Sequence, residues 1–329
     1  MSHLILHIGT HKTGSTTIQD SFWANSSRLA TFGLVYPRLH YRHTGHHGLI
    51  AQTVALPAAY HLKSGEDTTL KWINDKYSDS DKTVFLSSEE FSRGDGARSV
   101  DFLKLRDKLS GFKRVTVLCF LRPQWRFLQS IYLEISRTRS PPRMPDLVKE
   151  AIETGRCQGL YMNYLDLYKR LRAVFSGDEI RLVDFEAARA TKGGLLTAAL
   201  APFDPTKTYK DLRSYKQGHS NKSPHALSQW AANLLAEPYR ASAAVNRASH
   251  DVLGKHQTTC ILTRSEIADM KKAFSSGNRD LIGLQNAFQP GASISDPALP
   301  DECLFREDVS IEHWLKIGQT LARPLVKCG

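Results

Sequence analysis

The chain has 329 residues, 41% hydrophobic and 23% charged, which is typical of a globular protein with a large buried core. Lys and Arg number 44 against 33 Asp and Glu, so the net charge of +11 favours anionic partners such as nucleotides, nucleic acid, acidic glycans or an anionic membrane surface. The five cysteines are scattered and form no CxxC pair, which argues against a disulfide framework or a zinc site. No apolar run could span a bilayer, and the first predicted strand begins too early to leave room for a signal peptide, so we expect a cytoplasmic protein.

Short, continuously apolar segments predict strands that are buried on both faces, as in a parallel sheet. In chain order they are 4–8, 83–88, 114–121 and, more weakly, 179–185. Helical patterns lie between them over 15–30 and 124–136, the second directly after Pro123. Strands that alternate with helices predict an α/β fold of three layers around a central, mostly parallel sheet.

After residue 205 the pattern changes to amphipathic helices, over 223–240 and 263–288, and then to a loop over 289–308. We expect one domain, with an α/β nucleotide-binding core over 1–205 and a helical C-terminal cover over 206–329.

A glycine-rich loop follows the first strand. Gly9 and Gly14 keep the G-x-x-x-x-G spacing of a phosphate-binding P-loop, and Thr16 occupies its usual hydroxyl position. Backbone N–H groups in such a turn, at the positive end of the next helix, form a nest for an anion. However, Ser15 stands where a triphosphate loop has lysine, and Lys12 lies two residues before Gly14. We expect a different, shorter anion; the alternative is a polar turn with a helix N-cap.

The segment HIGTHKTGSTTIQ, residues 7–19, resembles the 5′-phosphosulfate loop of sulfotransferases that use 3′-phosphoadenosine-5′-phosphosulfate (PAPS), especially the bacterial, carbohydrate-type branch. Arg122 at the end of the third strand and Ser130 in the following helix, eight positions on, are similar to the pair that holds the 3′-phosphate in that family. Phe185, in the segment LVDFEAAR, falls where the family places an aromatic ring near the adenine. Here Ala187 replaces the usual acidic residue, and Phe185 is equally compatible with a core position.

The resemblance implies a P-loop-type fold and the transfer of a sulfuryl group from PAPS to an acceptor hydroxyl, leaving 3′,5′-adenosine bisphosphate. The residues implied to bind the 5′-phosphate are Lys12, Thr13, Gly14, Ser15, Thr16 and Thr17. Lys12 is also implied to act in catalysis, by neutralising the charge that develops on the bridging oxygen. No metal is expected, because the sulfuryl group carries less charge than a phosphoryl group.

Sulfuryl transfer to a hydroxyl needs a base to accept its proton. Glu89, at the end of the second predicted main strand, is our first candidate and Glu90 the second, because the family often presents the base there. Such a carboxylate needs its proton affinity raised by partial burial, or kept useful by the local field. His47 or His46 is the alternative base; a metal site on His43 and His47 is disfavoured, since no Cys or carboxylate accompanies them, and plain loop histidines are also possible.

The acceptor that we expect is a carbohydrate, glycolipid or other small molecule with a free hydroxyl, with residues 36–65 and the helices after 205 shaping its cleft. Peripheral contact with an anionic membrane surface is compatible with the charge. Nucleic acid is not expected, because the basic residues are dispersed and form no known binding module. The alternatives are a metal-dependent P-loop kinase, a basic nucleotide- or nucleic-acid-binding protein, and a PAPS binder without activity.

Overall fold

A computed structural model describes residues 1–94, 98–213 and 224–326 of the chain, with side chains as far as residue 323. These residues fall into two compact units. Unit 1 comprises Met1–Arg122, Gln158–Gly218 and Ser276–Asp296, and unit 2 comprises Pro123–Cys157, His219–Ser275 and Pro297–Gly329. Residues 123–157 group with most of the C-terminal helices, and residues 276–296 group with the sheet. The single domain with a division at residue 205 stays a prediction from the sequence.

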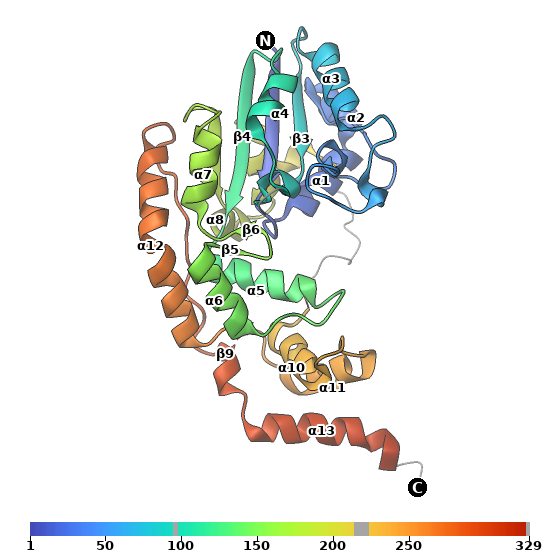
Figure 1. Cartoon of the computed structure of the whole chain (residues 1–329), viewed down its shortest axis with the longest axis vertical. Helices are drawn as coiled ribbons and strands as arrows, with labels where there is room; N and C mark the ends of the chain where they lie inside the picture. Colours follow the sequence, from blue (N-terminus) through green and yellow to red (C-terminus); the bar gives the residue numbers. More distant parts are fainter. Residues whose placement is uncertain (95–97, 214–223, 327–329) are drawn as a thin grey trace. The chain divides into compact units, whose positions relative to one another are not determined.

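Unit 1 contains a five-stranded parallel sheet in the order β2-β3-β1-β4-β7, flanked by helices (Figure 1). Its strands are β1 (His3–Gly9), β2 (Leu34–Val35), β3 (Thr83–Ser87), β4 (Arg114–Leu121) and β7 (Ile180–Asp184). The four predicted strands and the parallel α/β fold are thus confirmed. The two-residue strand β2 was not predicted, because so short a segment carries no apolar period.

The helices of unit 1 lie between and after these strands along the chain. They are α1 (Ser15–Ala24), α2 (Ser26–Thr31), α3 (Glu66–Tyr77), α4 (Phe102–Lys108), α7 (Tyr164–Arg172), α8 (Phe185–Ala190) and α9 (Gly194–Leu200). The single helix predicted over 15–30 is two helices that meet at Asn25. The Asn25 amide donates to the Ser21 carbonyl at 2.9 Å and accepts from the Arg213 N–H at 2.8 Å, so its side chain ties the break to a distant segment.

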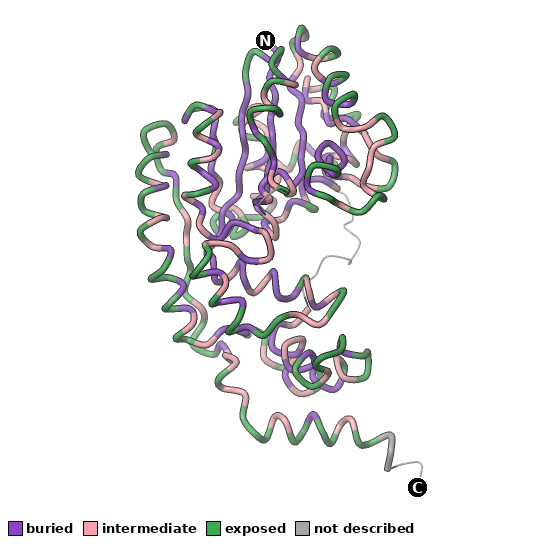
Figure 2. The backbone as a smooth tube through the Cα atoms, in the orientation of Figure 1, coloured by how far each residue is buried: buried purple, intermediate pink, exposed green. Residues whose placement is uncertain are grey.

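The core of unit 1 lies along β1, β3 and β4, in which every residue except Arg114 is buried (Figure 2). Every residue of β1 is buried, which explains its continuous apolar run. On one face Ile5, Phe22, Phe85 and Phe120 pack in a common cluster, with the Phe22 and Phe85 rings 4.8 Å apart. Burying each such aromatic ring contributes about 2–3 kcal/mol, so this cluster anchors α1 and the loop before it to the sheet.

Unit 2 is mainly helical. Its helices are α5 (Gln124–Ile135), α6 (Met144–Thr154), α10 (Ala226–Ala236), α11 (Ala243–Leu253) and α13 (Ile311–Val326), and its short parallel strands are β8 (Thr259–Cys260) and β9 (Leu304–Phe305). Helix α12 (Arg264–Asn286) begins in unit 2 and ends in unit 1. The predicted helices at 124–136, 223–240 and 263–288 correspond to α5, α10 and α12. Among the helices that the structure describes, none is long and apolar enough to cross a membrane.

Candidate active site

The order of the strands places a topological switch point at the carboxyl ends of β1 and β4. These neighbours lead to opposite sides of the sheet, β1 toward β2 and β4 toward β7, and ligands of open α/β sheets bind at such a switch point. The P-loop follows β1, and Arg122 follows β4 directly. The two segments are in contact, because Nη1 of Arg122 donates to the carbonyl oxygen of Lys12 at 3.2 Å. The structure thus brings together two predicted site residues that are 110 positions apart.

The P-loop ends at Gly14, which lies in the left-handed region with φ 79° and leads into α1. Within the described residues no side chain caps this helix end, and its first turn holds no acidic residue. The Ser15 hydroxyl is buried and has no hydrogen-bond partner in that part of the chain. An uncapped helix N-terminus beside an unsatisfied hydroxyl is suited to an anion, because N–H groups and the helix dipole both favour negative charge.

The three threonines that the resemblance assigns to phosphate binding differ in their surroundings. Thr13 is fully buried, and its hydroxyl donates to the Thr10 carbonyl at 2.6 Å, which closes the loop on itself. Thr16 is exposed and Thr17 is half-buried. Of these three, Thr16 and Thr17 therefore keep side chains available to a ligand, whereas Thr13 can contribute only through its backbone.

Arg122 is held by a carboxylate that the sequence analysis did not identify. Its Nη2 donates to Oε1 of Glu186 at 2.8 Å, and its guanidinium lies 4.8 Å from the centre of the Phe185 ring. Glu186 also lies 3.8 Å from Arg189. The family resemblance directed attention to the missing acid at Ala187, whereas the carboxylate that is present stands one position earlier.

Phe185 is buried beside the P-loop. A Cβ at Gly14 would lie 3.6 Å from Cε2 of Phe185, and it would lie only 2.7 Å from Cδ1 of Leu195. Gly14 therefore provides both the left-handed conformation and the close approach of α9. The ring of Phe185 packs between this turn and Arg122, at the edge where the resemblance places the adenine.

Ser130 lies in α5, in unit 2, whereas Arg122 is the last residue of the first segment of unit 1. The Ser130 hydroxyl donates to the Arg126 carbonyl one turn earlier, at 3.0 Å. The pairing of Arg122 with Ser130 around a phosphate stays a prediction from the sequence.

Glu89 lies at the carboxyl edge of β3, where it begins the 3₁₀ turn Glu89–Ser92. Nε2 of Gln19, on α1, donates to its Oε2 at 2.9 Å. Burial raises the pKa of Glu89, but the nearby His47 and His11 and the hydrogen bond from Gln19 outweigh it, so the net shift is downward. Glu89 is thus ionised at neutral pH and able to accept a proton. Its proton affinity is not raised by burial, which was the first of the two conditions that we expected for such a base.

Glu90 already has two side-chain partners, a histidine and an arginine. Its oxygens lie 3.3 Å from Nε2 of His11 and 2.6 Å from Nε of Arg93. Burial opposes ionisation, but these partners lower the pKa of Glu90 strongly. A carboxylate held in this way is a poor proton acceptor. Of the two candidates, Glu89, with its neutral amide partner, is the better base.

The histidines of the 36–47 loop have distinct roles. Nδ1 of His46 accepts from the Ser87 N–H at 2.8 Å, so Nε2 carries the proton and donates to the Pro37 carbonyl at 2.7 Å. Burial lowers the pKa of His46 to about 4. His46 is therefore a neutral residue that connects the loop to β3, and it is not available as a base. His47 is the histidine that remains as an alternative to Glu89.

His47 remains half-buried beside the candidate base, with Nδ1 2.9 Å from the Ser88 hydroxyl. His43 stacks on Tyr60, with the ring centres 4.3 Å apart. Across the residues that the structure describes, no three His, Cys, Asp or Glu side chains converge as a metal site would require. The arrangement around Glu89 is one of hydrogen bonds and charge.

Sequence reasoning missed three residues of the site: Gln19, His11 and Glu186. The signal for Gln19 was a polar residue beside Ile18 on the buried side of a helix, where it is only 2% exposed. A buried amide needs a partner, and here that partner is Glu89.

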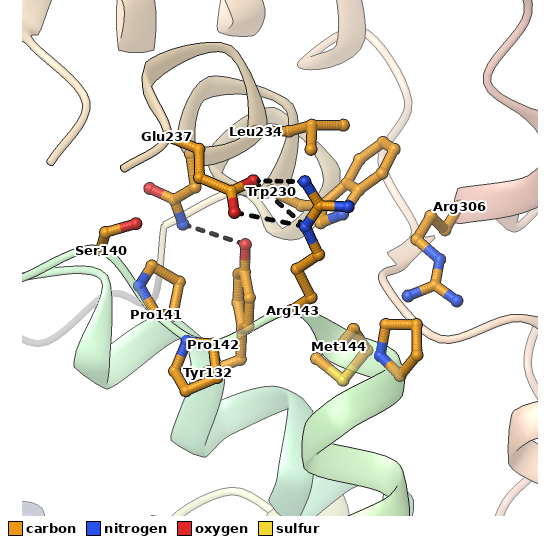
Figure 3. A pocket seen from close by; sticks show the side chains of 12 residues that line it. Tyr132, Ser140, Pro141, Pro142, Arg143, Met144, Trp230, Leu234, Glu237 and Arg306 are labelled. Carbon is orange, nitrogen blue, oxygen red and sulfur yellow. Dashed lines mark hydrogen bonds and ion pairs between the residues drawn. The ribbon is translucent and has the colours of Figure 1, made fainter. Parts of the chain in front are cut away.

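A pocket of about 320 Å³ lies within unit 2 (Figure 3). Aromatic, proline and methionine side chains line it, among them Tyr132, Pro141, Pro142, Met144, Pro145 and Trp230. Two arginines also line it, but Arg143 pairs with Glu237 across two nitrogens and Arg306 pairs with Glu266. With its cations already neutralised, this pocket is less suited to an anionic ligand than the P-loop.

No model of a known protein family matches the chain, and no curated protein matches it either. The functional assignment therefore depends on the geometry of the site and on the resemblance of its loop.

Proposed function

We propose that the chain is a sulfotransferase that moves the sulfuryl group of PAPS to an acceptor hydroxyl on a carbohydrate or glycolipid. The observation that carries the proposal is the anion nest at the start of α1, where Ser15 replaces the lysine of a triphosphate loop and its buried hydroxyl lacks a partner among the described residues. Lys12, inside the loop, supplies the positive charge from a different direction.

The residues at the carboxyl edge of the sheet can perform the steps of such a transfer. Glu89 accepts the proton of the acceptor hydroxyl as its oxygen attacks sulfur. The bond between sulfur and the bridging oxygen breaks, and its electron pair stays on the 5′-phosphate. Lys12 and the N–H groups at the start of α1 stabilise that negative charge. Gln19 and His47 hold Glu89 ionised and oriented.

Specificity for PAPS over ATP requires recognition of the 3′-phosphate. The assignment of Arg122 and Ser130 to this task follows from the resemblance alone. It is supported by the buried position of Arg122, whose guanidinium contacts the P-loop backbone. A buried guanidinium forms strong, directional bonds to phosphate oxygens.

The test is calorimetric titration with 3′,5′-adenosine bisphosphate, AMP and ATP with Mg²⁺. We expect the bisphosphate to bind more tightly than AMP by about 2 kcal/mol, about 30-fold, for one charge-assisted phosphate contact. Ser130→Ala should weaken that preference without breaking an ion pair, and Arg122→Ala should abolish it. Equal or tighter binding of ATP with Mg²⁺ would overturn the proposal in favour of a kinase.

A further inference from the structure

A second cavity, of about 750 Å³, lies in unit 1 on the side of the histidine loop. We call it the basic groove; the residues that define it here are Trp23, Arg38, His40, Tyr41, Lys63 and Trp72. They come from the end of α1, the 38–41 segment, the loop before α3, and α3 itself. No acidic residue is among those that line the groove.

The cations of the basic groove are not neutralised by carboxylates. In the described part of the chain neither Arg38 nor Lys63 has an acidic partner, and Arg38 donates only to the Ser26 hydroxyl and the Trp23 carbonyl. The nearest acids on α3 are engaged elsewhere, since Glu66 accepts from Thr53 and Asp67 pairs with Lys108. The groove therefore carries uncompensated positive charge, in contrast to the pocket of unit 2.

Aromatic rings beside these cations form the walls of the groove. Tyr41 is 74% exposed and Trp72 is 43% exposed, which is unusual for side chains of this size. The guanidinium of Arg38 lies 4.9 Å from the Trp23 ring centre, and Lys76 lies 4.7 Å from that of Trp72. An exposed ring packs against the apolar C–H face of a sugar, while the adjacent cation binds a carboxylate or sulfate on the same sugar.

A series of ring contacts connects the basic groove to the candidate base. His40 lies 4.8 Å from His43, His43 stacks on Tyr60 at 4.3 Å, and Tyr60 meets His47 edge to face at 5.6 Å. His47 bonds to Ser88, the residue before Glu89. These four rings are partly exposed, and they connect the basic groove to the carboxyl edge of β3.

We propose that the basic groove binds an anionic oligosaccharide, one that carries uronate or sulfate groups, and directs one of its hydroxyls to Glu89. This inference rests on the proposed sulfotransferase activity and specifies its acceptor. Ser64, Thr68 and Thr69 also line the groove and offer partners for sugar hydroxyls. Single-stranded nucleic acid is the competing anionic polymer for a groove of cations and aromatic rings, and the test below distinguishes it from the glycan.

The test measures binding of a uronate-containing chondroitin tetrasaccharide by calorimetry, with and without 3′,5′-adenosine bisphosphate. Lys63→Glu should weaken its binding by about tenfold, or about 1.4 kcal/mol. Lys113→Glu makes the same charge change on an exposed lysine just before β4, at the amino edge of the sheet, and should leave the affinity unchanged. Trp72→Ala should also weaken binding, and Trp72→Phe should restore most of it.

Two other ligands identify the class that the groove recognises. Neutral maltotetraose should bind far more weakly, and octathymidylate should bind no better than the tetrasaccharide. Equal binding of maltotetraose would overturn the role of charge, and tighter binding of octathymidylate would overturn the glycan in favour of nucleic acid. If the bisphosphate binds but the tetrasaccharide does not, the groove proposal fails alone. If the bisphosphate does not bind, the proposed function fails, while the tetrasaccharide titration still reports on the groove.

Discussion

Arg122 and Glu186 form an ion pair of 2.8 Å in which both side chains are more than nine-tenths buried. The same guanidinium contacts the P-loop through the Lys12 carbonyl. Glu186 therefore fixes a cation at the carboxyl edge of the sheet, on the border of the candidate nucleotide site.

Glu186→Gln should lower the free energy of unfolding by about 3 kcal/mol, because removing one partner of a buried pair leaves the other charge uncompensated. The measurement is urea denaturation at pH 7, read from the midpoint at constant m-value. Glu153→Gln, at an exposed position on α6, is the control and should change stability by less than about 0.5 kcal/mol. A loss from Glu186→Gln as small as that of the control would show that the pair does not stabilise the fold.

Ser15→Ala should separate stability from ligand affinity. Because the Ser15 hydroxyl is buried without a partner in the described structure, its removal should leave stability unchanged or raise it by up to about 1 kcal/mol. The same change should weaken 3′,5′-adenosine bisphosphate by about tenfold, if the hydroxyl bonds to the 5′-phosphate.

Ser249→Ala is the matched control, since Ser249 on α11 is equally buried and its hydroxyl has no partner within the same set of residues. It should affect stability in the same direction and leave the nucleotide affinity as it is. Equal loss of affinity in both variants would remove Ser15 from the site.

Glu89→Gln should reduce kcat for sulfuryl transfer by about 10²–10⁴-fold, because a base is lost while the bond from Gln19 can still form. Nucleotide affinity should stay within about twofold of the original, less than 0.5 kcal/mol. Since the pKa of Glu89 is below its ordinary value, it stays ionised from pH 5 upward, and activity limited by this base should not fall between pH 8 and pH 5. A fall in activity within this pH range that His47→Gln removes would assign the base to His47.

Three buried histidines should make the fold sensitive to acid. Burial lowers the pKa of His3, His7 and His46 to about 4 in each case. Their unfolded pKa is about 6.5, so between pH 6.5 and pH 4 the unfolded state binds more protons and stability falls as pH falls.

Each of these histidines contributes a slope of up to about 1.4 kcal/mol per pH unit within that window. This slope is measured by denaturation of the wild type and of His46→Gln in steps of half a pH unit from pH 4.5 to pH 8. Below pH 6.5 the slope of the variant should be smaller by up to about 1.4 kcal/mol per pH unit, and above pH 7 its stability should run parallel to that of the wild type. Identical slopes below pH 6.5 would contradict the assignment of His46 as a buried neutral group.

The sheet could be predicted from the sequence because its strands are buried on both faces. Segments such as 114–121 are continuously apolar, and the structure has β4 at those residues. The break at Asn25 could not be predicted, because its cause is a hydrogen bond to Arg213, which no local pattern reveals. Long-range contacts of this kind also decide which segments form each of the two units.

The candidate site could be predicted in part, because two of its elements follow predicted strands. The P-loop and Arg122 are marked by their positions after strands, and the structure places them in contact. Glu186 and Gln19 were missed because each matters through a partner that is distant in the chain, Arg122 and Glu89 respectively. The roles of Glu89 and Glu90 could not be separated by sequence, since only their side-chain partners in the structure distinguish them.

The two hydrogen bonds of His46 hold one end of the 36–47 loop in place, whereas the tip of the loop is exposed. The end of the loop is attached to β3 by the hydrogen bond of His46 and to α1 by the hydrogen bond between Thr44 and Asp20. The tip of the loop is exposed at Arg38, Tyr41 and Arg42. If the basic groove binds the acceptor, substitutions at the tip would change which polymer is selected without shifting Glu89. Acceptor preference could diverge or be redesigned there, residue by residue, in an otherwise unchanged protein.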